Sequence, residues 1–181
     1  MDRHVLLEML KSYKTDFGEE QTFVDRFVEL MKSDNCFQRT HLPGHITGSS
    51  WIVNPDKTKS LLVLHAKLNK WVQPGGHADG DENVWRVAVR EAEEETGLKN
   101  LNPFQEIFDL DIHVIPERKD FPAHFHYDIR FLVLAMETEK ITVSEESHEV
   151  RWINLKELER FTSERSVLRM KDKLALAHCS R

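Results

Sequence analysis

The segment Gly75–Leu98, GGHADGDENVWRVAVREAEEETGL, constrains the fold and function of this chain more than any other part of the sequence. It predicts an amphipathic helix, with Asp81 as the N-cap and Gly97 as the residue that ends it. Four of the five residues 91–95 are glutamates. Negative charge is unfavourable at a helix C-terminus, because the unsatisfied carbonyl groups already make that end negative. The acidic cluster therefore requires an explanation beyond helix formation.

Three of these glutamates share one side of the predicted helix. At about 100° per residue, Glu91, Glu94 and Glu95 fall within one sector, while Glu93 points elsewhere. Carboxylates that converge in this way repel one another unless a cation lies among them. Oxygen ligands suit a hard divalent ion such as Mg²⁺ or Mn²⁺ rather than zinc. The alternative is a solvated acidic helix face, which is common where glutamates follow one another.

The spacing of the whole segment favours the metal site. It reproduces the pattern G-x5-E-x7-R-E-U-x-E-E-x-G-U, in which U is a hydrophobic residue, at every fixed position. The fixed residues are Gly76, Glu82, Arg90, Glu91, Glu94, Glu95 and Gly97, and the U positions hold Ala92 and Leu98. This pattern is the Nudix box, and the chain resembles Nudix hydrolases from about residue 44 to residue 161.

The resemblance implies an α/β fold: an α/β/α sandwich around a mixed sheet. It also implies a metal-dependent hydrolase that cleaves a phosphoanhydride bond in a nucleoside diphosphate linked to another moiety. Mg²⁺ or Mn²⁺ held by Glu91, Glu94 and Glu95 would neutralise the diphosphate and favour attack by water at neutral pH. The carbonyl of Gly75 is implied as a further metal ligand. Arg90 would hold the carboxylates in place through charge-assisted hydrogen bonds.

The general base is expected among the glutamates. In Nudix hydrolases it is either a glutamate of the box or one on a later loop. Glu91 is the preferred candidate within the box. Glu146, in the segment SEESHEVRW, is the best candidate on a later loop.

A second group of polar residues lies on two predicted strands. In HFHYDIRF, the residues His124, His126, Asp128 and Arg130 share one strand face, and DLDIHVI before it alternates in the same way. Two interpretations are about equally favoured. The face is either the solvent-exposed side of an antiparallel pair, or it lines the substrate cleft, where Arg130 and the histidines contact a phosphate. A separate metal site is less favoured, because one alternating strand does not make its side chains converge.

Two residues elsewhere are further candidates for binding substrate. Trp71 could stack on a base, and His77, just inside the box loop, could reach a phosphate. The other histidines before the box, His45 among them, are expected to be structural or surface residues.

The chain is expected to contain a helical extension over residues 1–36, packed on a Nudix hydrolase domain over residues 37–181. Two apolar stripes predict two helices in the extension. In the domain, strands are expected at 46–53, 61–65, 107–115, 125–136 and 150–153, with closing helices at 155–161 and 166–177. The stretch between residue 65 and the box helix is expected to be a loop.

Composition limits the other functional classes. The formal net charge of −6 argues against an extended nucleic-acid surface. No apolar run approaches the roughly 20 residues of a membrane helix, and the N-terminus lacks a secretory pattern. Two distant cysteines without CxxC spacing indicate a cytoplasmic protein rather than a disulfide framework. The expected partners are a small nucleotide or diphosphate substrate and, through the N-terminal helices, a second copy of the chain.

Two alternative functions share the fold. One is a nucleotide-binding module that has lost catalysis, which the intact box disfavours. The other is an isoprenoid diphosphate isomerase, whose best-known form uses a catalytic cysteine on a core strand. Cys36 precedes the expected core and Cys179 is near the end of the chain, which disfavours this reading. The substrate stays open among nucleoside triphosphates, ADP-ribose, dinucleoside polyphosphates, nucleotide sugars and capped RNA ends.

Overall fold

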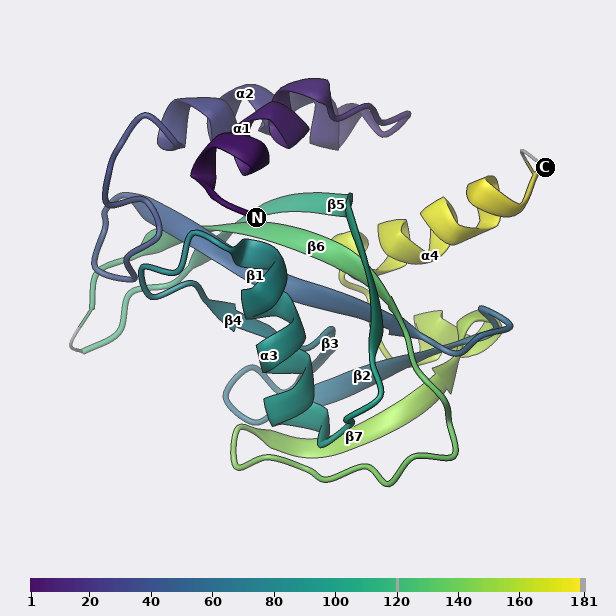
Figure 1. Cartoon of the computed structure of the whole chain (residues 1–181). Helices are drawn as coiled ribbons and strands as arrows, with labels where there is room; N and C mark the ends of the chain where they lie inside the picture. The colour runs from purple at the N-terminus through teal and green to yellow at the C-terminus, as the bar shows by residue number, and fades with distance from the viewer. Residues whose placement is uncertain (120, 180–181) are drawn as a thin grey trace. The chain divides into compact units, whose positions relative to one another are not determined.

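The computed structural model describes residues 1–119 and 121–179, and the side chains of 177–179, including that of Cys179, lie outside the described part (Figure 1). Its helices are α1 (Arg3–Ser12), α2 (Gly18–Leu30), α3 (Val84–Thr96), the 3₁₀ helix η1 (Leu155–Arg160) and α4 (Arg165–Cys179). Its strands are β1 (Gly44–Val53), β2 (Lys59–His65), β3 (Lys70–Val72), β4 (Gly75–His77), β5 (Asn102–Ile115), β6 (His124–Leu134) and β7 (Ser147–Asn154). No helix in this part of the chain has the length and apolar character needed to cross a membrane.

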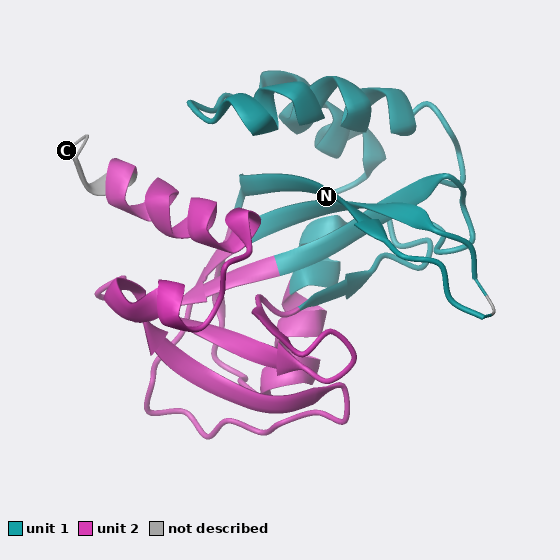
Figure 2. Ribbon diagram, turned by 180° about the vertical axis from the view of Figure 1, so that it is seen from behind, with its two compact units in different colours: residues 1–49, 75–88, 105–131 teal, residues 50–74, 89–104, 132–181 magenta. Residues whose placement is uncertain are grey.

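The chain forms two compact units, which are coloured separately in Figure 2. Unit 1 comprises residues 1–49, 75–88 and 105–131, and unit 2 comprises residues 50–74, 89–104 and 132–181. Strand β1 and helix α3 each begin in unit 1 and end in unit 2.

The two predicted N-terminal helices are present and belong to the core of unit 1. Leu6 of α1 and Phe27 of α2 are fully buried in one apolar cluster with residues of β5 and β6. The Phe27 ring meets the edge of Tyr127 on β6, with 5.3 Å between the ring centroids. A buried carboxylate, Glu20 of α2, accepts a hydrogen bond of 2.9 Å from the backbone N–H of Leu110 on β5. Apolar burial and this bond fix α2 against β5.

The sheet of unit 1 places β6 beside β1 and β5 beside β6, so the two polar strands are neighbours. Strand β4 pairs antiparallel with β1, where Gly75 faces Ser49 and His77 faces Thr47. This segment was expected to be a loop, and that expectation is wrong. A Cβ on Gly75 would lie 2.0 Å from the Ser49 Oγ, so only glycine allows this close pairing. A strand of three residues such as β4 is also too short to show an alternating pattern in the sequence.

Unit 2 is organised around β2. This strand pairs antiparallel with the end of β1, with β3 and with β7 along its length. Its buried side chains form a second apolar cluster with the C-terminal part of α3, and the members include Leu61, Val63, Ala92 and Leu98. The segment expected as a helix at 155–161 is a 3₁₀ helix, which Asn154 caps by accepting from the backbone N–H of Lys156.

The ends of α3 differ in how well the sequence predicted them. The helix begins at Val84, and Asn83 rather than Asp81 is the N-cap, because the Asn83 Oδ1 accepts from the backbone N–H of Arg86 at 3.2 Å. Asp81 instead accepts from the Asn83 N–H and pairs with the Arg86 side chain. The predicted C-terminus is confirmed: Gly97 has a φ of +75°, and its N–H donates to the Glu93 carbonyl at 2.9 Å.

Candidate functional site

Glu91, Glu94 and Glu95 of the box lie on the last turns of α3, in unit 2. Glu95 is buried, Glu91 is half-buried and Glu94 is exposed. The Arg90 guanidinium donates a hydrogen bond of 2.6 Å to the Glu91 Oε1, and its Nε lies 3.8 Å from the Glu94 Oε1. One cation therefore contacts two of the three carboxylates, which reduces the repulsion that their spacing creates.

The environment of Glu91 distinguishes it from an ordinary surface glutamate. Burial raises the pKa of its carboxyl above the usual value, Arg90 opposes that rise, and the charges of Glu94 and Glu146 add to it. Glu146 is thus within electrostatic reach of Glu91. It is exposed, in the turn before β7, and its backbone carbonyl accepts a hydrogen bond from Ala66 at 2.9 Å.

The donor set of the box suits Mg²⁺ or Mn²⁺, because it consists of carboxylate oxygens at positions i, i+3 and i+4 of one helix. Within the described residues, these three carboxylates do not converge to ligand distances; the group that does consists of histidines. Gly75, the predicted carbonyl ligand, lies in β4 and belongs to unit 1.

The polar face of β5 and β6 in unit 1 is buried around Arg130, so the solvent-exposed interpretation does not hold for this part of the face. Arg130 and Asp128 are each 2% exposed and Asp109 is fully buried. The Arg130 guanidinium donates to Asp128 at 2.7 Å, to Asp109 at 3.1 Å and to Asp111 at 3.2 Å. The hydroxyl groups of Thr47 and Ser49, on β1, donate to the other oxygen of Asp128. Arg130 therefore balances three buried carboxylates of the protein itself.

Burial opposes the positive charge of Arg130, but the aspartates outweigh it. Burial alone would lower the pKa of the guanidinium, whereas Asp111, Asp128 and Asp109 raise it above its ordinary value. Arg130 is therefore a permanent cation, held by these aspartates.

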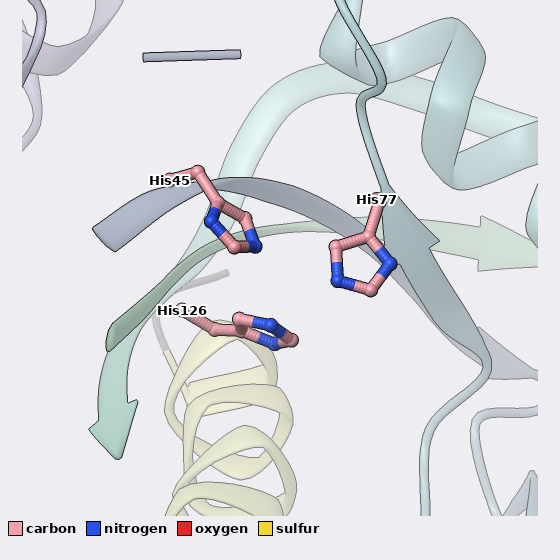
Figure 3. Close-up of side chains that lie close together, drawn as sticks. All are labelled: His45, His77 and His126. Carbon is pink, nitrogen blue, oxygen red and sulfur yellow. The ribbon is translucent and has the colours of Figure 1, made fainter. Parts of the chain in front are cut away.

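Histidines gather at one place in unit 1. His126 and His124 lie on β6, within the strand predicted for them, His77 lies on β4 rather than in the expected loop, and His45 on β1 joins them. Figure 3 shows the rings of His45, His77 and His126 turned toward one another. Ring centroids are 5.2 Å apart for His45 and His77, and 5.0 Å apart for His45 and His126.

The sequence argument missed His45, which was expected to be structural or at the surface. The signal that could have found it is the alternation His45, Thr47, Ser49 along β1, which mirrors the polar alternation of β6. An alternating strand does not make its own side chains converge, but neighbouring strands that expose polar residues on the same face do.

Trp71 lies on β3 in unit 2, and its ring is already in contact with other side chains. Phe161 packs against it edge-on at 5.9 Å between centroids, and the Arg151 guanidinium lies 5.8 Å from the Trp71 ring. Arg151 is in turn held by Glu149 through a hydrogen bond of 2.7 Å.

Comparison with known proteins shows which proteins this chain resembles. The model of the NUDIX domain family matches residues 45–173. Human nucleoside diphosphate-linked moiety X motif 6 is 27% identical over 128 residues, which are 66% of this chain and 38% of that protein. A probable DHNTP pyrophosphohydrolase of Lactococcus lactis is 26% identical over 136 residues, 74% of this chain and 80% of that protein. The matched part thus spans well under half of the human relative.

Solved structures resemble the chain in fold. An Ap4A hydrolase of C. elegans superposes with a TM-score of 0.60 at 17% identity, covering 75% of this chain and 98% of that one. A MutT protein of Methanosarcina mazei gives a TM-score of 0.60 at 22% identity, with 75% and 96% coverage. At these identities the likeness concerns the fold alone. It confirms the predicted fold class, a mixed β-sheet accompanied by helices.

Proposed function

This chain belongs to the Nudix hydrolase family, and we propose that it hydrolyses a phosphoanhydride bond in a nucleoside diphosphate linked to another moiety. The observation that carries the proposal is the complete box on α3, in which Arg90 contacts both Glu91 and Glu94. A module that had lost catalysis would have no need to keep three carboxylates and their arginine in one sector of a helix.

The carboxylates supply the chemistry expected of such a site. Glu91, Glu94 and Glu95 would hold Mg²⁺ or Mn²⁺, which neutralises the charge of the diphosphate and favours attack by water. Arg90 orients Glu91 and shields it from Glu94. The raised pKa of Glu91 makes its carboxylate a stronger base than an exposed glutamate, which suits it to accept a proton from the attacking water. Glu146, which acts on the pKa of Glu91, is the second candidate for this role.

The substrate-binding roles of Trp71, His77, His124, His126, Asp128 and Arg130 stay predictions. The same holds for a homodimer, for a cytoplasmic location and for the division into an extension at 1–36 and a domain at 37–181. The division is supported by the family match, which begins at residue 45, after both N-terminal helices.

The test is a substrate panel with Mg²⁺ or Mn²⁺, in which release of phosphate, pyrophosphate or nucleotide is measured. The panel includes a dinucleoside tetraphosphate, ADP-ribose and dihydroneopterin triphosphate. Proteins of similar fold include an Ap4A hydrolase, a dihydroneopterin triphosphate pyrophosphohydrolase and a NUDIX domain solved in complex with ADP-ribose. Wild type is compared with Glu95→Gln and with Glu93→Gln, a matched control on the same helix that lies outside the predicted ligand set.

We expect wild type and Glu93→Gln to hydrolyse one of these compounds, and the rate in Glu95→Gln to be lower by about 100-fold or more. Equal activity in all three proteins would overturn the metal assignment. Binding of a nucleotide without turnover by wild type would favour the binding module instead. Rearrangement of an isoprenoid diphosphate without hydrolysis would favour the isomerase.

A further inference from the structure

Three strands of unit 1 bring three imidazole rings to one point. His45 comes from β1, His77 from β4, which pairs with β1, and His126 from β6, which neighbours β1. One ligand nitrogen from each ring can be chosen so that all three lie within 4.8 Å of one another. The rings face a common centre in Figure 3. Convergence from three neighbouring strands is the geometry that a single alternating strand cannot produce.

Two of these rings carry a buried nitrogen that has no hydrogen-bond partner among the described residues. These nitrogens are the Nε2 atoms of His45 and His126, and His45 is only 1% exposed. Buried polar atoms normally have a partner, because leaving one unsatisfied is unfavourable. Two unsatisfied nitrogens beside a third imidazole point to a ligand that accepts their lone pairs.

The backbone fixes which nitrogen of His45 presents its lone pair. The His45 Nδ1 lies 3.3 Å from the carbonyl oxygen of His41. A carbonyl oxygen only accepts hydrogen bonds, so the Nδ1 carries the proton and the Nε2 is left with its lone pair. The same arrangement, with one ring N–H bonded to a backbone carbonyl, orients histidines that bind metal ions in proteins.

We propose that His45, His77 and His126 bind a divalent transition-metal ion of the zinc class, at a site separate from the box glutamates. Neutral imidazole is a preferred ligand of Zn²⁺ and a poor one for Mg²⁺, so the two sites select different ions. Three histidines leave a fourth position open for water or another ligand. Two nitrogens on one tetrahedral zinc ion lie about 3.4 Å apart, so the ligand nitrogens need to approach by at most about 1.4 Å on binding.

The surroundings favour a cation over a direct contact with phosphate. The three rings lie close together and have little contact with solvent, which disfavours their protonated, charged form. Neutral imidazoles have no charge to attract an anion, whereas they are the form that binds metal. The three aspartates around Arg130 lie on the same strand faces, and their formal charge exceeds that of the arginine.

The experiment measures Zn²⁺ binding to the full chain after chelation, in buffer with millimolar Mg²⁺ to occupy the box. Co²⁺ serves as the spectroscopic probe, since its visible absorption reports coordination by nitrogen. The variants are His77→Gln and His126→Gln, which keep polarity and much of the volume. The matched control is His113→Gln. The His113 ring contacts that of His126, with 5.4 Å between the ring centroids, but His113 does not belong to the ligand set. Glu95→Gln tests independence from the box.

We expect one Zn²⁺ per chain in wild type, His113→Gln and Glu95→Gln, with affinity at least about 100-fold weaker in the two ligand variants. Zn²⁺ at 100 times its dissociation constant should raise the unfolding midpoint of wild type by roughly 5–10 °C. Absence of a zinc site under excess Mg²⁺, unchanged affinity in both ligand variants, or loss in Glu95→Gln alone would overturn the proposal.

A measurement on wild type covers the case in which a variant fails to fold. In protein labelled with ¹⁵N-histidine, Zn²⁺ should shift the ring-nitrogen resonances of His45, His77 and His126 and leave those of exposed histidines unchanged. Shifts confined to other histidines would contradict the proposal. The result does not depend on hydrolysis, so a failure of the proposed function and a failure of this site are distinguishable.

Discussion

Replacement of Arg130 by methionine tests the central electrostatic argument about unit 1. The side chain of Arg130 is 2% exposed and donates to Asp109, Asp111 and Asp128. Methionine fills a similar volume but supplies neither charge nor donors. Three carboxylates, exposed by 8% or less as whole residues, would then lose the guanidinium that they share.

The expected loss of stability is large. Removing one partner from a buried ion pair lowers the free energy of unfolding by about 3–5 kcal/mol, because the other charge stays buried and unpaired. Here three charges lose the same partner, so we expect the upper end of that range. Since whole domains are stable by about 5–15 kcal/mol, Arg130→Met should be marginally folded at 25 °C. Arg130→Lys keeps the charge without the planar fork and should lose less.

The assay is urea unfolding at pH 7, followed by circular dichroism. Arg165→Met is the matched control, because Arg165 forms an ion pair with Asp172 in which both side chains are exposed. We expect this variant to change the free energy of unfolding by less than about 1 kcal/mol. The double variant Arg130→Met/Asp111→Asn should be more stable than the sum of its single changes predicts. A loss below 1 kcal/mol for Arg130→Met would refute the argument. Intact stability with a raised KM would instead support the predicted contact of Arg130 with substrate.

Three further predictions concern acid, a helix end and a thiol. Because the folded pKa values of His77 (about 4) and His126 (about 2) lie below about 6.5, the unfolded state binds more protons. The free energy of unfolding, measured by urea titration, should therefore decrease as the pH is lowered from about 6.5 to 4. The decrease should be less steep in the double variant His77→Gln/His126→Gln. Gly97→Ala puts a Cβ atom on a residue with φ +75°, only 2.7 Å from a threonine side-chain carbon, so we expect the free energy of unfolding to fall by at least about 1–2 kcal/mol. Gly18→Ala, where the added Cβ meets open space, should leave the free energy of unfolding unchanged in the same assay. Burial raises the pKa of Cys36 to about 11, so peptide mapping after alkylation at pH 8 should find it unmodified until the chain unfolds.

Features that depend on neighbours in the chain could be predicted from the sequence. The spacing of the box placed Glu91, Glu94 and Glu95 on one helix, and the glycine at residue 97 marked its end. Alternation identified the polar strands and their apolar opposite faces, and apolar stripes identified the two N-terminal helices. Helical and strand periodicity are local properties, so they can be recognised in the sequence without knowledge of the fold. The start of α3 was harder to predict, because Asp81 and Asn83 are both good N-cap residues.

Tertiary structure decided which distant residues meet. The sequence left the polar face of β6 open between solvent and substrate, whereas the structure buries Arg130 among three aspartates from two strands. It likewise left His45 as a structural or surface residue, whereas the pairing of β4 with β1 placed it beside His77 and the position of β6 next to β1 placed it beside His126. That pairing depends on the absence of a side chain at Gly75. Convergence of side chains is set by strand order and register, which arise from contacts between segments far apart in the chain.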